Sequence, residues 1–453
     1  MNSMFGKLSY KLVAHALRMP VFSLINEFEH AEQMSIDALQ QCQWNKLQEL
    51  IKYAVTHSPY YKKLFADIGA EAKDIKDEAS FRKIPYLSKK IIKEKGNEIL
   101  VRPTSWSVVD AKTSGSTGKP LKIYKDSEGR ASTYAAMYRG HRWYGVDVGA
   151  REARLWHVPN TTLNRTKSSI EDFMLNRVRQ EDAKVCDMTF KNFYSKMKQF
   201  YPEYLMGYPS LIFLFCTFLK KKELDGKSLN LKFVKCTAEV LNDFQKNLIE
   251  DVFGCPCISE YGATETGVVS FECPARQHHI MAESVFVEFE NNDGMEDKFC
   301  EMFITNLYNR VFPIIRYKIG DLAYPKTNNC CCGRSLPLMS EVVGRIHDAI
   351  IAADGNRFHS SILSTIFKEL IKQGFDLKQI RIVQSEIGKI KVQMVKSATS
   401  PVKKYEPVKK IIQRAFNDAI YVDTEYCDVL ERDPSGKHRY FVSCINRGGT
   451  KFA

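Results

Sequence analysis

The chain has 453 residues, enough for a large α/β unit with an appended domain and too many for a peptide hormone or a lone binding module. Its 44% hydrophobic and 26% charged residues are ordinary for a globular protein, which excludes wholesale disorder. The net charge of +13 favours anionic partners. Nucleic acid, a membrane surface and a phosphorylated small molecule are all compatible with such a positive charge.

The first hundred residues are predicted to be helical. Apolar residues recur at three- and four-residue spacing from Phe28 to Phe65, and Pro59 interrupts the pattern, so we expect an amphipathic helical cap. The longest apolar run, 211–219, is far shorter than the ~20 residues of a membrane helix, which predicts a buried helix and no membrane span. The odd cysteine number, 13, and the absence of an export signal predict a reducing, cytoplasmic location.

Short apolar runs alternate with helical ones from about Val108 onward. The segments 229–240, 241–254 and 255–262 have the pattern of strand, helix and strand, which predicts mostly parallel sheets covered by helices. After Gly344 a second pattern begins, with two strands in 379–395, a helix in 401–420, and strands in 421–430 and 438–445. This part carries an excess of Lys and Arg over Asp and Glu, and we expect a small basic α+β domain.

A glycine- and hydroxyl-rich loop follows the short apolar run that ends at Asp110. Such a loop can wrap phosphate oxygens, because glycines let backbone N–H groups converge while hydroxyls and a lysine supply further donors. The spacing is not that of a Walker loop, since two residues separate the glycines. The loop consists of Thr113, Ser114, Gly115, Ser116, Thr117, Gly118, Lys119 and Pro120.

Four further motifs follow in order, and with the loop they resemble the adenylate-forming (ANL) superfamily, specifically its phenylacetate-CoA ligase and CapK-like branch. The branch assignment uses Ser-Pro-Tyr-Tyr-Lys-Lys-Leu-Phe near the N-terminus, Gly-Tyr-Pro-Ser at 207–210 and a Cys-Gly-Arg string before Gly344. The motifs are Tyr261-Gly262-Ala263-Thr264-Glu265, Tyr317-Lys318-Ile319-Gly320-Asp321, Gly344-Arg345-Ile346-His347-Asp348 and Ser435-Gly436-Lys437.

The resemblance implies a fold and a set of roles. The fold is α/β, with a large N-terminal domain (1–347) of mixed sheets covered by helices and a small mobile α+β domain (348–453) that swings about the hinge residue Asp348. Ser114, Ser116, Thr117 and Lys119 of the loop hold the β- and γ-phosphates of ATP, and Thr264 touches the α-phosphate. The other implied roles are adenine stacking for Tyr261, nucleotide binding for Gly262, Ala238 and Glu239, magnesium for Glu265, ribose for Asp321, ribose or phosphate for Arg345, and the acid and α-phosphate for Lys437.

The implied reaction joins a small-molecule carboxylic acid and MgATP to form acyl-AMP and pyrophosphate, and an acceptor then displaces AMP. Coenzyme A is the expected acceptor, and an amine that gives an amide is the alternative, as in surface polysaccharide synthesis. A catalytically silent nucleotide-binding scaffold is opposed by the presence of Lys437 and Glu265. No nucleic-acid partner is expected, because the positive net charge is not accompanied by a recognised nucleic-acid-binding motif. The residues do not indicate which carboxylic acid is used or what the oligomeric state is, and a homodimer is one expectation for the latter.

A second group of residues has the composition of a metal site. Cys273 lies six residues before His279, and Cys330 and Cys332 follow as C-x-C. Thiolate and imidazole ligands suit tetrahedral zinc, and similar positions in some relatives form a structural zinc site, so these four residues are the predicted ligands. The spacing also admits Cys331 in place of Cys330, His278 in place of His279, or free thiols.

Overall fold

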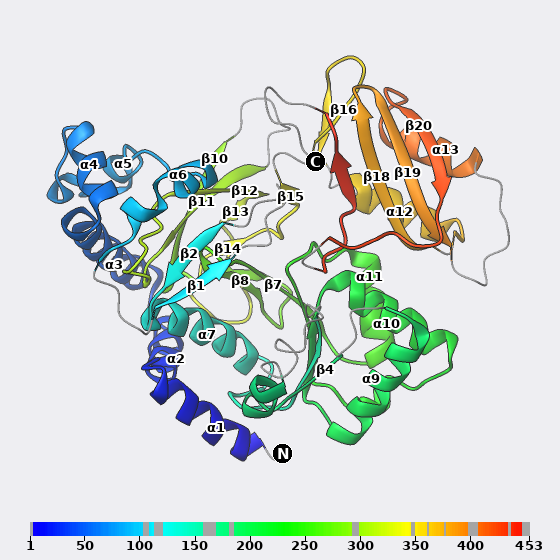
Figure 1. Cartoon of the computed structure of the whole chain (residues 1–453), viewed down its shortest axis with the longest axis horizontal. Coiled ribbons are helices and arrows are strands. Elements are labelled where there is room, and N and C mark those ends of the chain that lie inside the picture. Colours follow the sequence, from blue (N-terminus) through cyan, green and yellow to red (C-terminus); the bar gives the residue numbers. More distant parts are fainter. Residues whose placement is uncertain are drawn as a thin grey trace.

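The computed structural model describes residues 3–102, 108–112, 121–156, 169–180, 185–291, 299–345, 349–359, 362–375, 377–396, 406–433 and 436–445. A large unit contains the residues up to Arg345, and a smaller one contains those from Ala349 (Figure 1). The α/β fold with a smaller C-terminal unit is confirmed. None of the described helices is long and apolar enough to cross a membrane.

Helices cover one side of the large unit, as the apolar spacing predicted. Ser35 begins the longest of them by accepting a hydrogen bond from the Ala38 N–H, and the helix ends at His57, just before Pro59 starts the next one. The helices of this region are α1 (Ser3–Ala16), α2 (Val21–Ala31), α3 (Ile36–His57), α4 (Pro59–Asp67), η1 (Ala72–Asp74), α5 (Glu78–Phe81) and α6 (Lys89–Ile99).

A nine-stranded sheet forms the centre of the described large unit. Its strands in spatial order are β13 (Pro325–Lys326), β14 (Leu338–Met339), β9 (His278–Ile280), β8 (Gly267–Glu272), β7 (Cys257–Ala263), β6 (Phe233–Thr237), β5 (Tyr204–Gly207), β3 (Glu152–Leu155) and β4 (Arg177–Arg179). The pairings from β4 to β7 are parallel, and those from β7 to β13 are antiparallel. The expectation of mostly parallel sheets is therefore correct for one half only.

Helices cover both faces of the parallel half. Successive residues of β6 face opposite sides, so Phe233 joins the core beneath α7 (Ser127–Arg142) and Val234 joins the core beneath the helices of the other face. Those helices are α9 (Asp187–Phe200), α10 (Pro209–Lys221) and α11 (Asp243–Phe253), with the short η2 (Lys227–Leu229) before β6. The predicted buried helix at 211–219 is part of α10, and the predicted strand, helix and strand are β6, α11 and β7.

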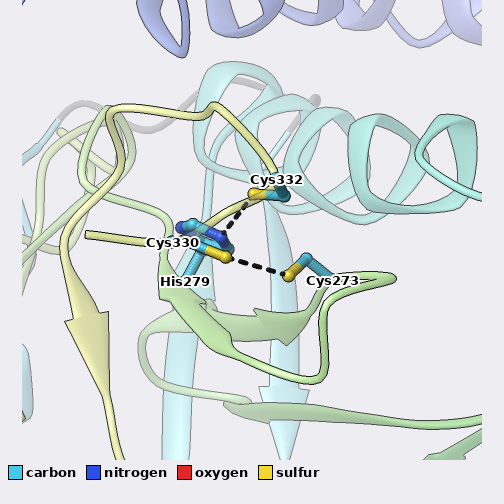
Figure 2. A group of neighbouring side chains, drawn as sticks. All are labelled: Cys273, His279, Cys330 and Cys332. Carbon is cyan, nitrogen blue, oxygen red and sulfur yellow. Dashed lines mark hydrogen bonds between the residues drawn. The ribbon is translucent and has the colours of Figure 1, made fainter. Parts of the chain in front are cut away.

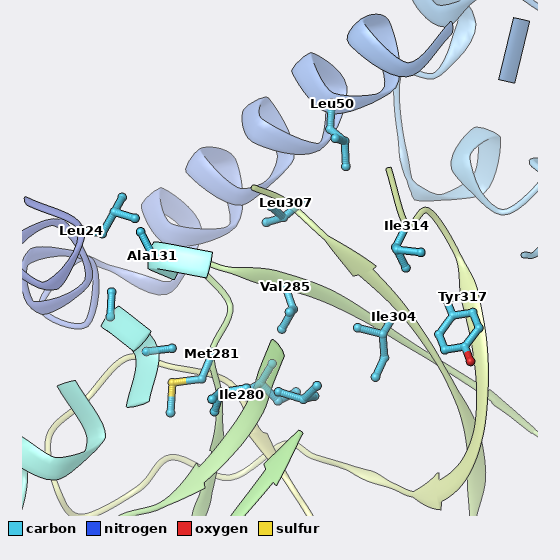
Figure 3. Packing of buried hydrophobic residues seen from close by; sticks show 14 of the residues in the cluster. Leu24, Leu50, Ala131, Ile280, Met281, Val285, Ile304, Leu307, Ile314 and Tyr317 are labelled. Atoms are coloured by element: carbon cyan, nitrogen blue, oxygen red, sulfur yellow. The ribbon is translucent and has the colours of Figure 1, made fainter. Parts of the chain in front are cut away.

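A second, four-stranded antiparallel sheet has the order β10-β11-β12-β15. Leu50 of α3 lies over the strands that carry Val285 and Ile304, in the core between the helical cap and this sheet (Figure 3). The strands are β10 (Val285–Asn291), β11 (Cys300–Asn306), β12 (Tyr317–Ala323) and β15 (Gly344–Arg345), and a separate hairpin contains β1 (Val109–Lys112) and β2 (Lys122–Lys125).

The small unit is an α+β structure with its own hydrophobic core, which includes Ile382, Val392 and Ile412. Its four-stranded sheet has the order β20-β19-β18-β21. The sequence pattern predicted these strands and α13 but not α12. The elements are β16 (Ala349–Ile351), β17 (Arg357–His359), α12 (Ile362–Lys372), β18 (Leu377–Glu386), β19 (Lys389–Lys396), α13 (Glu406–Ala415), β20 (Tyr421–Tyr426) and β21 (Phe441–Ser443).

Candidate functional site

Three residues of different predicted motifs meet where β7, β12 and β15 come together. The Tyr261 hydroxyl donates a hydrogen bond of 2.8 Å to Oδ2 of Asp321, and Arg345 Nε lies 3.4 Å from Oδ1 of the same carboxylate. The second contact follows from strand register, because Asp321 and Arg345 are direct partners in the antiparallel pair of β12 and β15. The sheet thus assembles one polar cluster from residues up to 84 positions apart.

Burial controls the electrostatics of this cluster. It raises the pKa of the Asp321 carboxyl, while Arg345 and the Tyr261 hydrogen bond oppose the rise. Burial and the nearby Asp321 carboxylate raise the pKa of Tyr261 well above its usual value. Tyr261 therefore remains a neutral donor, and Asp321 is a partly buried acceptor with a cation beside it.

Glu265 lies in the turn between β7 and β8 and is 5% exposed. The Tyr317 hydroxyl donates a hydrogen bond of 3.0 Å to its Oε1. Thr264, next to it, is exposed. The turn requires a glycine before it, since a Cβ at Gly262 would lie 2.6 Å from the Gly267 carbonyl oxygen. A buried carboxylate oxygen is thus held at a fixed place beside the Asp321 cluster.

Two lysines that the sequence analysis did not identify face the same region. Lys125 is 9% exposed, and burial lowers its pKa to about 8 although Glu265 raises it. Lys89, at the start of α6, has its pKa lowered by burial and then by Arg345, while Glu265 and Asp321 raise it. The sequence did contain one signal that Lys125 is buried. In a strand, residues two positions apart lie on the same face, and Lys125 shares its face of β2 with the apolar Ile123.

Lys437 extends toward this cluster from the small unit. The charged neighbours of the partly buried Lys437 ammonium in the large unit are Arg345, Glu239 and Asp321. Burial lowers the pKa of Lys437, Arg345 lowers it further, and the nearby carboxylates oppose the change. The Lys437 backbone N–H donates to Asp433 Oδ1 at 3.1 Å, and the Asp433 N–H donates to the Lys437 carbonyl at 3.0 Å, so two hydrogen bonds hold the Lys437 backbone to Asp433.

The structure describes some of the remaining predicted site residues and not others. The phosphate loop (113–120) and the hinge residue Asp348 lie outside the described residues. Ala238 follows β6 with a φ of 69°, in the left-handed region that glycine adopts most readily. The Glu239 carboxylate accepts hydrogen bonds from the Ser210 and His438 backbone N–H groups. The described contacts of this carboxylate therefore connect the two units.

The four predicted metal ligands lie together beside β9, as Figure 2 shows. One ligand atom from each of them lies within 4.8 Å of all the others. Cys273 Sγ is 3.6 Å from Cys330 Sγ, and His279 Nε2 is 3.2 Å from Cys332 Sγ. The residues are Cys273 just after β8, His279 in β9, and Cys330 and Cys332 between β13 and β14.

Local contacts give this group its geometry. His279 Nδ1 lies 3.0 Å from the Leu336 carbonyl oxygen, which fixes the ring with Nε2 facing the sulfur atoms. Burial lowers the pKa of His279 to about 4, which keeps the imidazole neutral. Cys331 is exposed, and His278 lies 3.4 Å from Glu341 instead. The group thus contains Cys330 rather than Cys331, and His279 rather than His278.

Comparisons with known proteins agree with this architecture. The sequence model of the CapK C-terminal domain family matches residues 350–444. Protein CapK of Staphylococcus aureus is 22% identical over 90% of this chain and 90% of its own length. Phenylacetate-coenzyme A ligase of Thermus thermophilus is 22% identical over 73% of this chain and 76% of its own length.

A solved structure resembles nearly the whole chain. The crystal structure of 2-hydroxyisobutyryl-CoA ligase, in the postadenylation state with an acyl-AMP, matches with a TM-score of 0.75 and 15% identity. The match covers 92% of this chain and 91% of that protein. The two chains therefore share a fold that includes both units.

Proposed function

Because the chain has the fold of the adenylate-forming CoA ligases and ends in a CapK C-terminal domain, we propose that it is an ATP-dependent acid ligase. It converts a carboxylic acid and ATP to acyl-AMP and pyrophosphate, and then transfers the acyl group to an acceptor. The observation that carries the proposal is that the His438 N–H of the small unit donates a hydrogen bond to Glu239 of the large one, so that the adjacent Lys437 interacts electrostatically with Arg345, Glu239 and Asp321.

The chemistry needs positive charge where these residues supply it. Attack of a carboxylate oxygen on the α-phosphate brings two anions together, so the Lys437 ammonium stabilises the transition state by contacting both. Asp321 accepts hydrogen bonds from the ribose hydroxyls, a role that suits a buried carboxylate with two acceptor oxygens. Arg345 beside it offsets the negative charge of the carboxylate and of the phosphates.

Glu265 fits the role of a magnesium ligand. Its carboxylate is a hard oxygen donor, buried and fixed by Tyr317. Magnesium bound there would neutralise phosphate charge. Lys125 and Lys89 both interact electrostatically with Glu265, and we add them to the proposed ATP site as cations that would offset phosphate charge. The phosphate loop and the hinge Asp348, with the domain boundary between residues 347 and 348, complete the proposed machinery.

Coenzyme A is the proposed acceptor, as the name of the Thermus thermophilus relative indicates. The proposal is tested by pyrophosphate release from MgATP with a panel of aromatic, aliphatic and amino acids, including phenylacetate, and with hydroxylamine to capture acyl-AMP. One acid should stimulate release and give a hydroxamate. Addition of CoA should then yield a thioester, whereas turnover on an amine without CoA would replace CoA as the acceptor.

Asp321→Ala should weaken ATP binding by about 10- to 100-fold, because hydrogen bonds to a buried carboxylate contribute about 1.5–3 kcal/mol. Isothermal titration with a non-hydrolysable ATP analogue measures the change. The matched control is Asp251→Ala, since Asp251 is an exposed surface residue of α11 paired with Lys220. Equal affinity of wild type and Asp321→Ala would remove the ribose role.

The cysteine and histidine group is proposed to bind structural zinc. Tetrahedral zinc with Zn–S bonds of about 2.3 Å places two sulfur atoms about 3.8 Å apart, and the Cys273–Cys330 distance of 3.6 Å agrees with that geometry. Three thiols and one neutral imidazole form a closed ligand set of the structural type. Such a site would join the end of β8 to the segment between β13 and β14.

A further inference from the structure

We infer that the Glu239 carboxylate and the Arg432 guanidinium form a latch that holds the small unit where Lys437 lies in the site. The inference rests on the proposed function and adds a positioning device to it. The latch is defined by Glu239 and Ser210 of the large unit and by Arg432 and His438 of the small one. It stabilises the arrangement used for adenylation, and its release allows the small unit to swing for acyl transfer.

The contacts of the latch cross between the two units. Glu239 Oε1 accepts a hydrogen bond of 2.7 Å from the His438 backbone N–H, and its Oε2 accepts one of 3.1 Å from the Ser210 backbone N–H. Arg432 Nη1 donates to Ser210 Oγ at 2.9 Å and lies 3.9 Å from Glu239 Oε1. One carboxylate thus binds both units at once.

The latch acts at the residue next to the catalytic lysine. His438 follows Lys437 directly, so the hydrogen bond from its N–H fixes the backbone one residue from Lys437. Arg432 also donates a bond of 3.0 Å to the Gly436 carbonyl, on the other side of Lys437. The backbone that carries Lys437 is therefore held on both sides by groups of the latch.

Burial makes the latch sensitive to domain position. The Glu239 side chain is 4% exposed and that of Arg432 is 15% exposed. Burial raises the pKa of Glu239, while Arg432 and the hydrogen bonds from Ser210 and His438 oppose the rise. If the small unit moves away, Glu239 loses the Arg432 charge and the His438 donor together. Both charge-assisted contacts are lost when the units separate, so they favour the closed arrangement.

A second ion pair between the units provides the control. Lys368 of α12 lies 3.0 Å from Asp243 of α11, and their side chains are 66% and 69% exposed. Exposed pairs contribute little because water and salt screen them. Lys368→Met therefore removes a charge pair between the same two units without touching the latch.

The first experiment reads domain position without any substrate. Purified full-length protein is reductively methylated with formaldehyde and a borohydride reagent, and mass spectrometry follows Lys437, with exposed Lys389 as the internal reference. We expect Lys437 to react at least about fivefold faster in Arg432→Met and in Glu239→Gln than in wild type, because the population shifts toward the open arrangement. Lys368→Met should match wild type. Unchanged Lys437 reactivity in both latch variants would overturn the inference.

The second experiment separates positioning from a general structural role. With the acid that the panel identifies, Arg432→Met should slow pyrophosphate release at least about tenfold while the KM for ATP stays within about twofold. Thioester formation from supplied acyl-AMP and CoA should keep its wild-type rate. A parallel loss in both half-reactions would contradict the latch. Absence of turnover in wild type would reject the ligase, whereas the methylation result would still decide the latch.

Discussion

Lys437→Ala should lower the rate of acyl-adenylate formation by about 100-fold or more. The substitution removes the cation that lies beside Arg345, Asp321 and Glu239 and that the proposed mechanism uses to stabilise the transition state. A 100-fold loss corresponds to about 2.7 kcal/mol, which is the size expected when one charged donor at a reacting phosphate is lost. Pyrophosphate release measures the effect.

The fold and ATP affinity should change little in this variant, because the Lys437 side chain belongs to none of the hydrophobic cores. Lys389→Ala is the matched control, since Lys389 belongs to the same small unit and is exposed at the end of the β18–β19 hairpin. It should keep the wild-type rate. A wild-type rate in Lys437→Ala would contradict the assignment of the lysine.

Cys332→Ser should abolish zinc binding and lower the free energy of unfolding by at least about 3 kcal/mol, because a structural metal contributes its binding free energy to folding. The cluster joins segments that are separated by 57 residues at Cys273 and Cys330. Elemental analysis of the purified protein and denaturant unfolding measure the two effects. Treatment of the wild type with a strong chelator should reproduce the loss of stability.

Cys331→Ser is the control for that experiment. Cys331 lies next to Cys332 in the chain but is exposed and outside the ligand group. It should retain zinc and stability. Less than about half an equivalent of zinc in the wild type would remove the metal proposal. The three cysteines would then be free thiols beside the buried imidazole of His279.

The sequence predicted the parts of the site that depend on motifs. Tyr261, Asp321 and Arg345 were assigned from three separate motifs, and the structure places their side chains in contact. The predicted metal ligands also meet, because the turn after β8 and the C-x-C segment reach the same end of β9. Short motifs with fixed local geometry are readable in sequence because each needs particular residue types at fixed spacing.

Contacts between distant segments were not readable in the same way. Lys89 and Lys125 belong to no motif and approach Glu265 only because α6 and β2 come together in the fold. The Glu239 carboxylate was expected to take part in nucleotide binding, and its described contacts join residues of both units. The antiparallel half of the large sheet does not follow from the alternation of strand and helix patterns, because that rule describes connections between parallel strands, and only the family resemblance implied mixed sheets.

The central claim is that the protein forms an acyl-adenylate, and the nucleotide product tests it most directly. Purified protein is incubated with ATP, magnesium, the acid that stimulates turnover and hydroxylamine, which takes the acyl group from acyl-AMP and releases AMP, and the nucleotides are then separated by chromatography. The account predicts AMP and pyrophosphate in equal amounts, and their formation should depend on the acid and be lost in Lys437→Ala. Formation of ADP and phosphate would contradict the account, because the bond broken would then be to the γ-phosphate rather than the α-phosphate.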